Sequence, residues 1–335
     1  ASPVPAKKEA PQTPEVINTK PRLLVLPFRN LNNDEENEYL VDGIVEDIIT
    51  EFSMIHSIEI ISRHTAFNFK GKEINSQQIT SELGVNFIAT GSIRSAGSRI
   101  RISVELMEDV FEIQDELVRK VIVALVGQLE IASLARAKRK PTENLSSYEF
   151  LLRGKENHHK FSKEGVLEGL QMFDKSIDAD PENAQAYAWK VCTLGQGMFA
   201  GYLEEPVEDL FEEAQKTLQK ALDINPNDFE CHRMFCEIYK SFEDFEKAEL
   251  HGRKAYEMNP NDPRIVNGFG EYLLLTGDTE KGVELMIKAY ELDPNGKGDS
   301  NSNKRLGDIV FACYVHGEFE KSLEYAEKIE KLTTN

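Results

Sequence analysis

Hydrophobic and polar positions in the first part of the chain follow the spacing of strands and helices in turn. The apolar run RLLVLPF at 22–28 predicts a buried strand, and IEIIS at 58–62 predicts a second one. Between them, apolar residues recur every four positions, which predicts an amphipathic helix. Its apolar stripe consists of Leu40, Ile44, Ile48 and Phe52.

Two further elements follow the second strand. NSQQITSELG at 75–84 predicts a short helix that Asn75 or Ser76 caps at its start and Gly84 ends. NFIATGSIRSAGSRIRISVELM at 86–107 alternates apolar and polar residues on both sides of a Ser/Gly turn, which predicts a β-hairpin. The order so far is βαβαββ, which indicates a mixed α/β domain.

A long helix is expected next, from Asp109 to about Ala135, because its apolar residues recur at helical spacing. It ends in RAKRKP, where cations suit a helix C-terminus and Pro141 stops the helix. The sequence therefore predicts a flexible, Pro/Ala/Lys-rich tether at 1–21, an α/β domain at 22–140 and a second domain at 141–335.

The second domain has only helical patterns, and one short phrase repeats in it. DADPENA, DINPNDF, EMNPNDP and ELDPNGK place prolines at 181, 226, 260 and 294, at intervals of 45, 34 and 34 residues. A 34-residue period with Pro after the second helix is the signature of the tetratricopeptide repeat. The longer interval holds 11 extra residues, which we place within 195–206.

Small residues support this register, since two antiparallel helices need them for close packing. They precede the four prolines by 12 and 5 positions each time. The pairs are Gly169 and Ser176, Ala214 and Ala221, Ala248 and Ala255, and Gly282 and Ala289. A last pair at 304–332 completes a superhelix of about five helix pairs.

Composition narrows the range of functions. With 335 residues, 40 % of them hydrophobic, the chain can form about two domains. Its net charge of −19 argues against binding to nucleic acid. No run approaches about 18 apolar residues, so we expect no membrane insertion by this segment. Four scattered cysteines predict free thiols and a cytoplasmic location, or a periplasmic one if an export signal or membrane span precedes residue 1.

The sequence shows no recognisable catalytic, cofactor or metal site. No Gly-rich phosphate loop follows a strand, and no nucleophile–base set can be assembled. His158 and His159 are adjacent, which is poor geometry for two ligands of one metal on a helix, so we expect an exposed pair. This segment is therefore predicted not to be an enzyme and to need no cofactor.

Three stretches are candidate interaction sites. Residues 30–56 hold eight acidic residues and no Lys or Arg, which predicts either a solvated surface or a docking patch. Arg63 and Lys70 follow the second predicted strand, and the carboxyl ends of strands often border ligand sites. Together with Arg94 of the predicted hairpin, they could bind an anion. The first helices of the repeats should line a peptide-binding groove. By repeat register it presents Arg233, Glu237, Lys240, Arg264, Asn267 and Glu271.

The residues quoted above, with ISRHTAFNFKGK, ELGVNFIATGSIRS and RAKRKPTENLSSYEFLLRG, resemble a TolB-like amino-terminal α/β domain followed by tetratricopeptide repeats. This arrangement is similar to the carboxy-terminal region of bacterial class III adenylate/guanylate cyclase-type signalling proteins. The resemblance implies a non-catalytic regulatory module that binds a protein or peptide, such as an upstream output domain of the same protein. Alternatives are a cyclase whose catalytic domain lies upstream, the sensor region of a winged-helix regulator, and an envelope scaffold.

The chain departs from that family at one point. Family members have a turn and a further strand before the helix EDVFEIQDEL, whereas here VELM runs directly into it. A connection of about 2–6 residues is normal at such a junction. We therefore expect a missing strand and turn between Met107 and Glu108 in the native chain.

Overall fold

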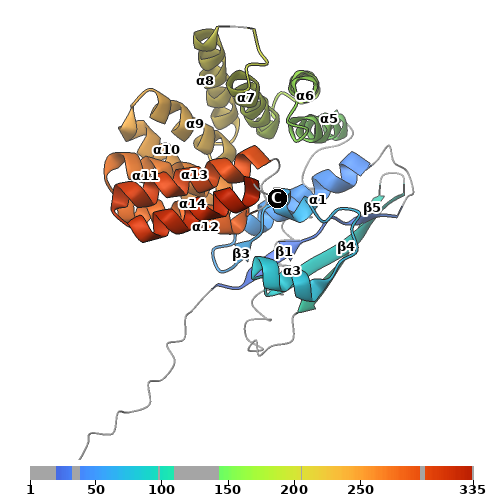
Figure 1. Cartoon of the computed structure of the whole chain (residues 1–335). Helices are drawn as coiled ribbons and strands as arrows, with labels where there is room; N and C mark the ends of the chain where they lie inside the picture. Colours follow the sequence, from blue (N-terminus) through green and yellow to red (C-terminus); the bar gives the residue numbers. More distant parts are fainter. Residues whose placement is uncertain are drawn as a thin grey trace, which may run out of the picture.

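The computed structural model describes residues 20–31, 38–96, 99–108, 143–204, 206–294 and 299–333. The described residues up to 108 form a five-stranded sheet with helices against it, and those from 143 onward form a curved array of helices (Figure 1). The strands are β1 (Arg22–Val25), β2 (Arg29–Asn30), β3 (Glu59–Ile60), β4 (Phe87–Ala96) and β5 (Arg99–Glu108).

Strand β4 is the centre of the sheet. Along one edge it pairs antiparallel with β5 over its whole length, so β1 and β2 must share its other edge, where both run parallel to it. The strand predicted at 22–28 ends at Val25, and a second short strand follows after a break. Pro27 lies in the break, where a residue without a backbone N–H cannot donate to the ladder. The hairpin β4–β5 is confirmed as predicted.

Among the described residues, three helices accompany the sheet: α1 (Glu38–Ser53), α2 (Arg63–Phe67) and α3 (Ser76–Leu83). The apolar stripe predicted for α1 is buried against the sheet, with Leu40 partly so. In α3 the Asn75 side chain accepts from the backbone N–H of Gln78, and Gly84 ends the helix at φ +60°. The left-handed region favours glycine, so both predicted ends of this helix are confirmed.

Ten helices of the described chain follow, in five consecutive pairs. They are α5 (Glu143–His158), α6 (Lys163–Ala179), α7 (Ala184–Phe199), α8 (Val207–Ile224), α9 (Phe229–Ser241), α10 (Phe245–Met258), α11 (Pro263–Thr276), α12 (Thr279–Leu292), α13 (Asp299–His316) and α14 (Phe319–Thr333). Each proline of the recurring phrase lies between one helix pair and the next, as the repeat pattern requires.

The small residues of the repeat are buried where the helices of a pair meet. Gly282 shows why. A Cβ atom there would lie 2.9 Å from the carbonyl oxygen of Gly270 and 3.0 Å from the backbone nitrogen of Leu274. These atoms belong to the facing helix α11, so only glycine allows α11 and α12 to approach this closely.

The extra residues of the long repeat lie at the tip of the α7–α8 pair, near the predicted stretch. Much of the insertion is helical, however. Helix α7 has 16 residues where α9 has 13, and α8 has 18 where α10 has 14. The connection spans 200–206, compared with 242–244 in the next repeat.

The expected interruption between Met107 and Glu108 is not found. Both residues belong to β5, and they pair with Ile88 and Phe87 of β4. The long helix expected from Asp109 to Ala135 and the predicted domain boundary near Pro141 lie outside the described residues. The same holds for residues 1–19 of the tether predicted at 1–21.

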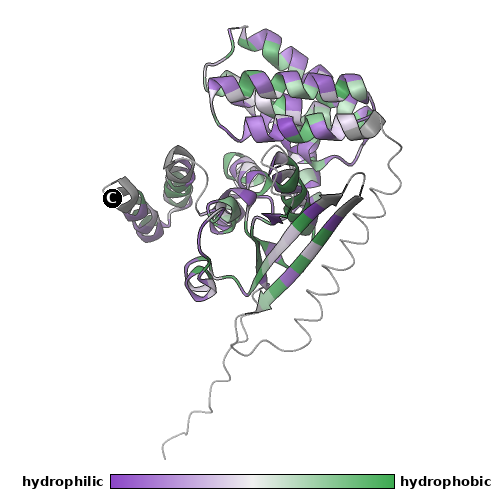
Figure 2. Cartoon of the chain, turned by 90° about the vertical axis from the view of Figure 1, so that its right-hand side faces the viewer, coloured by the Kyte–Doolittle hydropathy of each residue, from purple (hydrophilic) through white to green (hydrophobic). Residues whose placement is uncertain are grey.

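Helix α1 lies between the sheet and the helical array, and the array curves over it (Figure 1). The Leu152 side chain of α5 occupies the space beside Gly43 of α1, where a Cβ atom would lie 2.6 Å from it. Hydrophobic and hydrophilic residues alternate along the long hairpin, and both kinds occur along the helices of the array (Figure 2). None of the described helices is both long and apolar enough to cross a membrane.

Candidate functional site

Glu46 of α1 is buried at the contact between the sheet domain and the array, with 5 % of its surface exposed. Its carboxylate lies 2.8 Å from Arg63 Nε, 3.0 Å from His159 Nε2 and 3.6 Å from Lys155 Nζ. Arg63 comes from α2, whereas the other two residues come from the C-terminal end of α5. We call these four residues the Glu46 cluster.

Protonation in the Glu46 cluster follows from burial and charge. Burial alone would raise the pKa of Glu46, but His159, Lys155 and Arg63 together hold that pKa well below its usual range. Burial, with the charge of Arg63 adding to it, lowers the pKa of His159 well below its usual value. His159 is therefore neutral near pH 7. Because an ionised carboxylate can only accept, His159 donates its Nε2–H to Glu46.

The acidic stretch of α1 also makes other contacts within the chain. Asp47 accepts a hydrogen bond from the Tyr148 hydroxyl at 2.6 Å, and Asp42 pairs with Lys70 at 2.7 Å. These carboxylates face basic and hydroxyl groups of the same chain. For these carboxylates, the contacts within the chain differ from both alternatives predicted for residues 30–56, a solvated surface and a docking patch. The acidic residues 34–36 lie outside the described residues.

Asp293, just after α12, is a second buried carboxylate that joins the two parts, at 1 % exposure. It accepts hydrogen bonds from the hydroxyls of Ser62 and Thr65 on the sheet side and from Arg305 on the array side. Burial alone would raise the pKa of Asp293, but hydrogen bonding from His64 and the charge of Arg305 lower it below its usual range.

Asn261 makes the third polar contact between the parts. Its side-chain nitrogen lies 2.9–3.0 Å from the carbonyl oxygens of Ser53, Ile55 and Ile58. It thus satisfies acceptors of the segment that leaves α1 and enters β3. Asn261 belongs to the NPND phrase, so a residue of the repeat signature fastens the array to the sheet domain.

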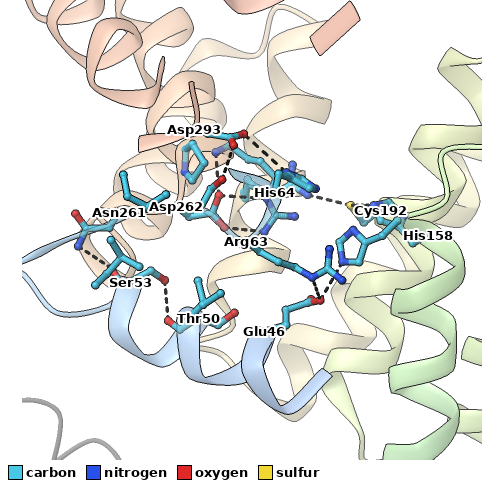
Figure 3. Close-up of a pocket in the computed structure, with 18 of the residues that line it drawn as sticks. Glu46, Thr50, Ser53, Arg63, His64, His158, Cys192, Asn261, Asp262 and Asp293 are labelled. Carbon is cyan, nitrogen blue, oxygen red and sulfur yellow. Dashed lines mark hydrogen bonds and ion pairs between the residues drawn. The ribbon is translucent and has the colours of Figure 1, made fainter. Parts of the chain in front are cut away.

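These contacts enclose a pocket of about 220 Å³ between α1, β3 and α2 on one side and the first helices of the array on the other (Figure 3). Four arginines from both parts line it, together with three carboxylates. Its apolar wall is formed by Ile49, Ile60, Ile61, Phe161, Trp189 and Pro263. The basic and acidic side chains are Arg63, Arg233, Arg264, Arg305, Glu46, Asp262 and Asp293.

His158 and His159 line this pocket, and the expectation of an exposed pair was wrong. They are 8 % and 7 % exposed. The Nδ1 atom of His158 lies 2.9 Å from the Thr193 hydroxyl, and burial lowers the pKa of His158 to about 3. The helix α5 ends at this point, and the pair is covered by α7 and α1. Among the described residues, no group of three potential ligands could hold a metal ion.

The structure separates the three residues of the predicted anion site. Arg63 lines the pocket, but Lys70 is paired with Asp42 and Glu38 outside it. Arg94 is exposed on β4 and faces Arg101 of β5. Of these three residues, only Arg63 reaches the pocket.

The six predicted groove residues fall into two groups. Arg233 and Arg264 both pair with Glu230, which is 1 % exposed and was not predicted. These two arginines face the pocket. Asp262, Asp293 and Arg305 were also missed; the aspartates are part of the recurring Pro phrase, which was a signal for them.

The other four groove residues form a network across α9 and α11. Lys240 Nζ lies 2.9 Å from both Glu237 and Glu271, and the Asn267 amide donates to Glu271 at 2.6 Å. Charges of these neighbouring carboxylates raise the pKa of Lys240 although burial alone would lower it. The predicted register thus brings these four side chains together.

An apolar hollow of about 340 Å³ lies beside this network, between α7, α8 and α9. Its lining includes Leu194, Met198, Phe199, Phe211 and Met234. Phe199 is 83 % exposed, which is unusual for so large an apolar side chain. The hollow therefore offers an open apolar surface next to charged groups.

No protein-family model matches the chain. A curated relative is "Putative adenylate cyclase 3" of Rhizobium meliloti (strain 1021), 28 % identical over 240 residues. The match covers 67 % of this chain and 41 % of the relative, so the chain spans about two fifths of that protein's length.

Similar solved structures include tetratricopeptide-repeat proteins. YrrB, a tetratricopeptide-repeat protein with an unusual peptide-binding site, is 19 % identical at a TM-score of 0.36, over 51 % of this chain and 79 % of that one. PilF of Pseudomonas aeruginosa is 14 % identical at 0.43, over 56 % and 77 %. MamA of Desulfovibrio magneticus RS-1 is 16 % identical at 0.40, over 56 % and 96 %.

Proposed function

We propose that the chain is a non-catalytic regulatory and protein-interaction module of a bacterial signalling protein. The tetratricopeptide array binds a peptide segment of a partner, and a TolB-like α/β domain docks onto the inner side of the array. The observation that supports this most is the Glu237–Lys240–Asn267–Glu271 network, because it lies on the first helices and remains accessible.

The network favours a basic partner. Lys240 is 7 % exposed at its side chain, whereas Glu237 and Glu271 are 39 % and 31 % exposed. The ammonium group is thus below the surface and its two carboxylates face outward. Asp308 of α13 adds a third carboxylate near Glu271. Burial raises the pKa of Asp308, and the charge of Glu271 raises it further. The accessible surface therefore carries a net negative charge.

Apolar anchors flank this acidic surface. In α13, Phe311 and Tyr314 are 60 % and 63 % exposed. Helices α11 and α13 are each followed by a glycine with positive φ, Gly277 and Gly317. Phe311 precedes Gly317 by the same number of residues as Glu271 precedes Gly277, so the two side chains occupy equivalent positions. Together with the hollow beside Phe199, this arrangement suits a peptide that combines Lys or Arg with large apolar side chains.

The whole protein is best placed among the nucleotide cyclases, with its catalytic domain outside this chain. The curated relative supports this placement by its name. The α/β domain would then relay or dock, acting in the cytoplasm on an output domain of the same protein. In this view the chain itself turns over no nucleotide: incubation with ATP or GTP should yield no cyclic product, and clear production would refute the assignment.

Peptide binding can be tested by selecting peptides from a display library against the full chain. Enriched peptides should carry an excess of Lys or Arg next to aromatic or aliphatic residues. Their affinity should fall about tenfold or more in a Glu237→Gln/Glu271→Gln variant. The matched control is Glu212→Gln/Glu284→Gln, which alters exposed carboxylates on the second helices α8 and α12.

Two results would contradict the proposal. One is a failure to enrich any peptide with the folded chain. The other is enrichment of peptides that bind the groove variant and the control variant equally, because the acidic surface would then have no part in recognition.

A further inference from the structure

The pocket between the two parts holds guanidinium groups whose hydrogen-bonding capacity is only partly used. Arg63 Nε lies 2.8 Å from the Glu46 carboxylate, and the guanidinium carbon of Arg63 lies 4.1 Å from the centre of the Phe67 ring. In the described part of the chain, its two terminal nitrogens have no hydrogen-bond partner. Ion pair and ring thus fix the group while leaving four N–H donors unused.

Arg305 is in the same situation on the opposite wall. Its Nη1 donates to the carbonyl oxygen and carboxylate of Asp293. No partner for its Nε or Nη2 is found among the residues that the structure describes. The side chains of Arg63 and Arg305 are each 15 % exposed, so these donors are largely shielded from bulk water.

The carboxylates of the pocket, in contrast, are engaged. Asp293 already accepts from two hydroxyls and an arginine, and Glu46 faces three basic groups. Arg264 uses its nitrogens on Glu230 and Asp262. Formal charges are close to balance, so preference for a ligand comes from the surplus of donors. A surplus of charged donors selects an anionic oxygen acceptor.

The remaining wall is apolar and contains Trp189. A cavity of roughly 150 Å³ is enough to hold benzene, and this pocket measures about 220 Å³. It therefore has room for a ring-sized apolar body and one oxyanion group. Its place at the carboxyl end of β3 is also where open α/β sheets commonly present ligand sites.

We propose that this pocket binds a small organic anion, with one phosphate or carboxylate group held by Arg63 and Arg305 and a compact apolar body against Trp189. This site is separate from the peptide groove. Because Arg63 belongs to the sheet domain and Arg305 to the array, the bound anion bridges the two parts. Occupancy of the pocket should accordingly strengthen their docking.

Trp189 makes the test direct, because it is the single tryptophan of the chain. The full chain is titrated with phenyl phosphate, benzoate and inorganic phosphate at constant ionic strength, and the fluorescence of Trp189 is recorded. Benzyl alcohol serves as the uncharged control. A saturable change with phenyl phosphate or benzoate is expected, together with a rise in melting temperature, since a ligand that binds only the folded state stabilises it.

Trp189 also borders a second cavity, on the side of Lys155, so variants must locate the response. Arg63→Gln and Arg305→Gln should each weaken binding about tenfold or more, the loss expected for a charge-assisted hydrogen bond. Arg253→Gln is the control, because its side chain is 54 % exposed and pairs with Glu249 far from the pocket lining. If one arginine variant does not fold, the other one decides.

Three outcomes would overturn the proposal. The first is the absence of a saturable response to either aromatic anion. The second is an equal response to benzyl alcohol, which would show that no anion is required. The third is unchanged affinity in a folded arginine variant. A response to inorganic phosphate alone would refute the apolar half of the ligand.

Discussion

Replacing Glu46 by Gln tests whether the Glu46 cluster holds the two parts of the chain together. The substitution preserves the shape of the side chain and an acceptor for His159, but removes the charge. Arg63 then loses its carboxylate at 2.8 Å, while Lys155 keeps Asp47 at 3.2 Å.

The expected loss of unfolding free energy is about 3 kcal/mol. Removing one partner of a buried ion pair costs roughly 3–5 kcal/mol, because a charge is left buried without compensation. The lower end applies here, since the Arg63 side chain is 15 % exposed and Lys155 retains a partner. With a urea m-value of about 3 kcal/mol/M, this loss lowers the unfolding midpoint by about 1 M.

Urea unfolding followed by Trp189 fluorescence is the appropriate assay, because that residue borders the contact. Glu212→Gln is the control: it alters an exposed pair of α8 and should change stability by less than about 0.5 kcal/mol. A double-mutant cycle with Arg63→Gln should give a coupling of at least about 1 kcal/mol. A loss below 1 kcal/mol for Glu46→Gln, or strictly additive effects, would refute the reasoning.

Three further predictions concern the same interface and the repeats. Asn261→Ala should lower the free energy of unfolding in urea by about 1–3 kcal/mol, because it leaves backbone carbonyls without their donor. Asn227→Ala, at the same position of the preceding repeat but exposed, should lower it little. Equal losses would contradict the role of Asn261. Gly282→Ala should cost about 1–3 kcal/mol by forcing α11 and α12 apart, whereas Gly307→Ala, which meets nothing within 4 Å, should be neutral or stabilising; the reverse order would show that the helices can separate freely. The third prediction concerns pH: the pKa of His158 is lowered from 6.5 to about 3 in the folded chain, so the unfolded chain binds the proton first. The free energy of unfolding should therefore fall as the pH drops below about 6.5, by up to about 1.4 kcal/mol per pH unit from this residue. A free energy of unfolding that is unchanged between pH 7 and 5 would contradict this prediction.

Local signals in the sequence were sufficient for most of the elements. The spacing of apolar residues in α1, the caps of α3 and the alternation along β4 and β5 depend on near neighbours, and all three are found as predicted. The repeat was predictable for the same reason: each pair contacts mainly the next one, so one set of positions recurs at a fixed period.

Contacts between distant segments were not predictable in this way. Glu46 and His159 lie 113 residues apart and Ser62 and Asp293 lie 231 apart, so no periodicity connects them. Each charged residue read alone suggested solvent or an external partner. The error about the His158–His159 pair has this origin, because their burial depends on α1, which belongs to another part of the chain.

The arrangement of charge along the array suggests a division of its inner surface. The arginines of the first helices that lie near α1, Arg233 and Arg264, are engaged with Glu230 and line the pocket under the sheet domain. Farther along the same helices, the positions of Glu237 and Glu271 lie beyond that contact and remain accessible. One face of the repeats therefore serves both purposes: its inner part fixes the α/β domain, and its outer part is left for a partner. A ligand in the pocket and a peptide on the groove would then act on the same helices, which gives the chain a physical route for coupling the two events.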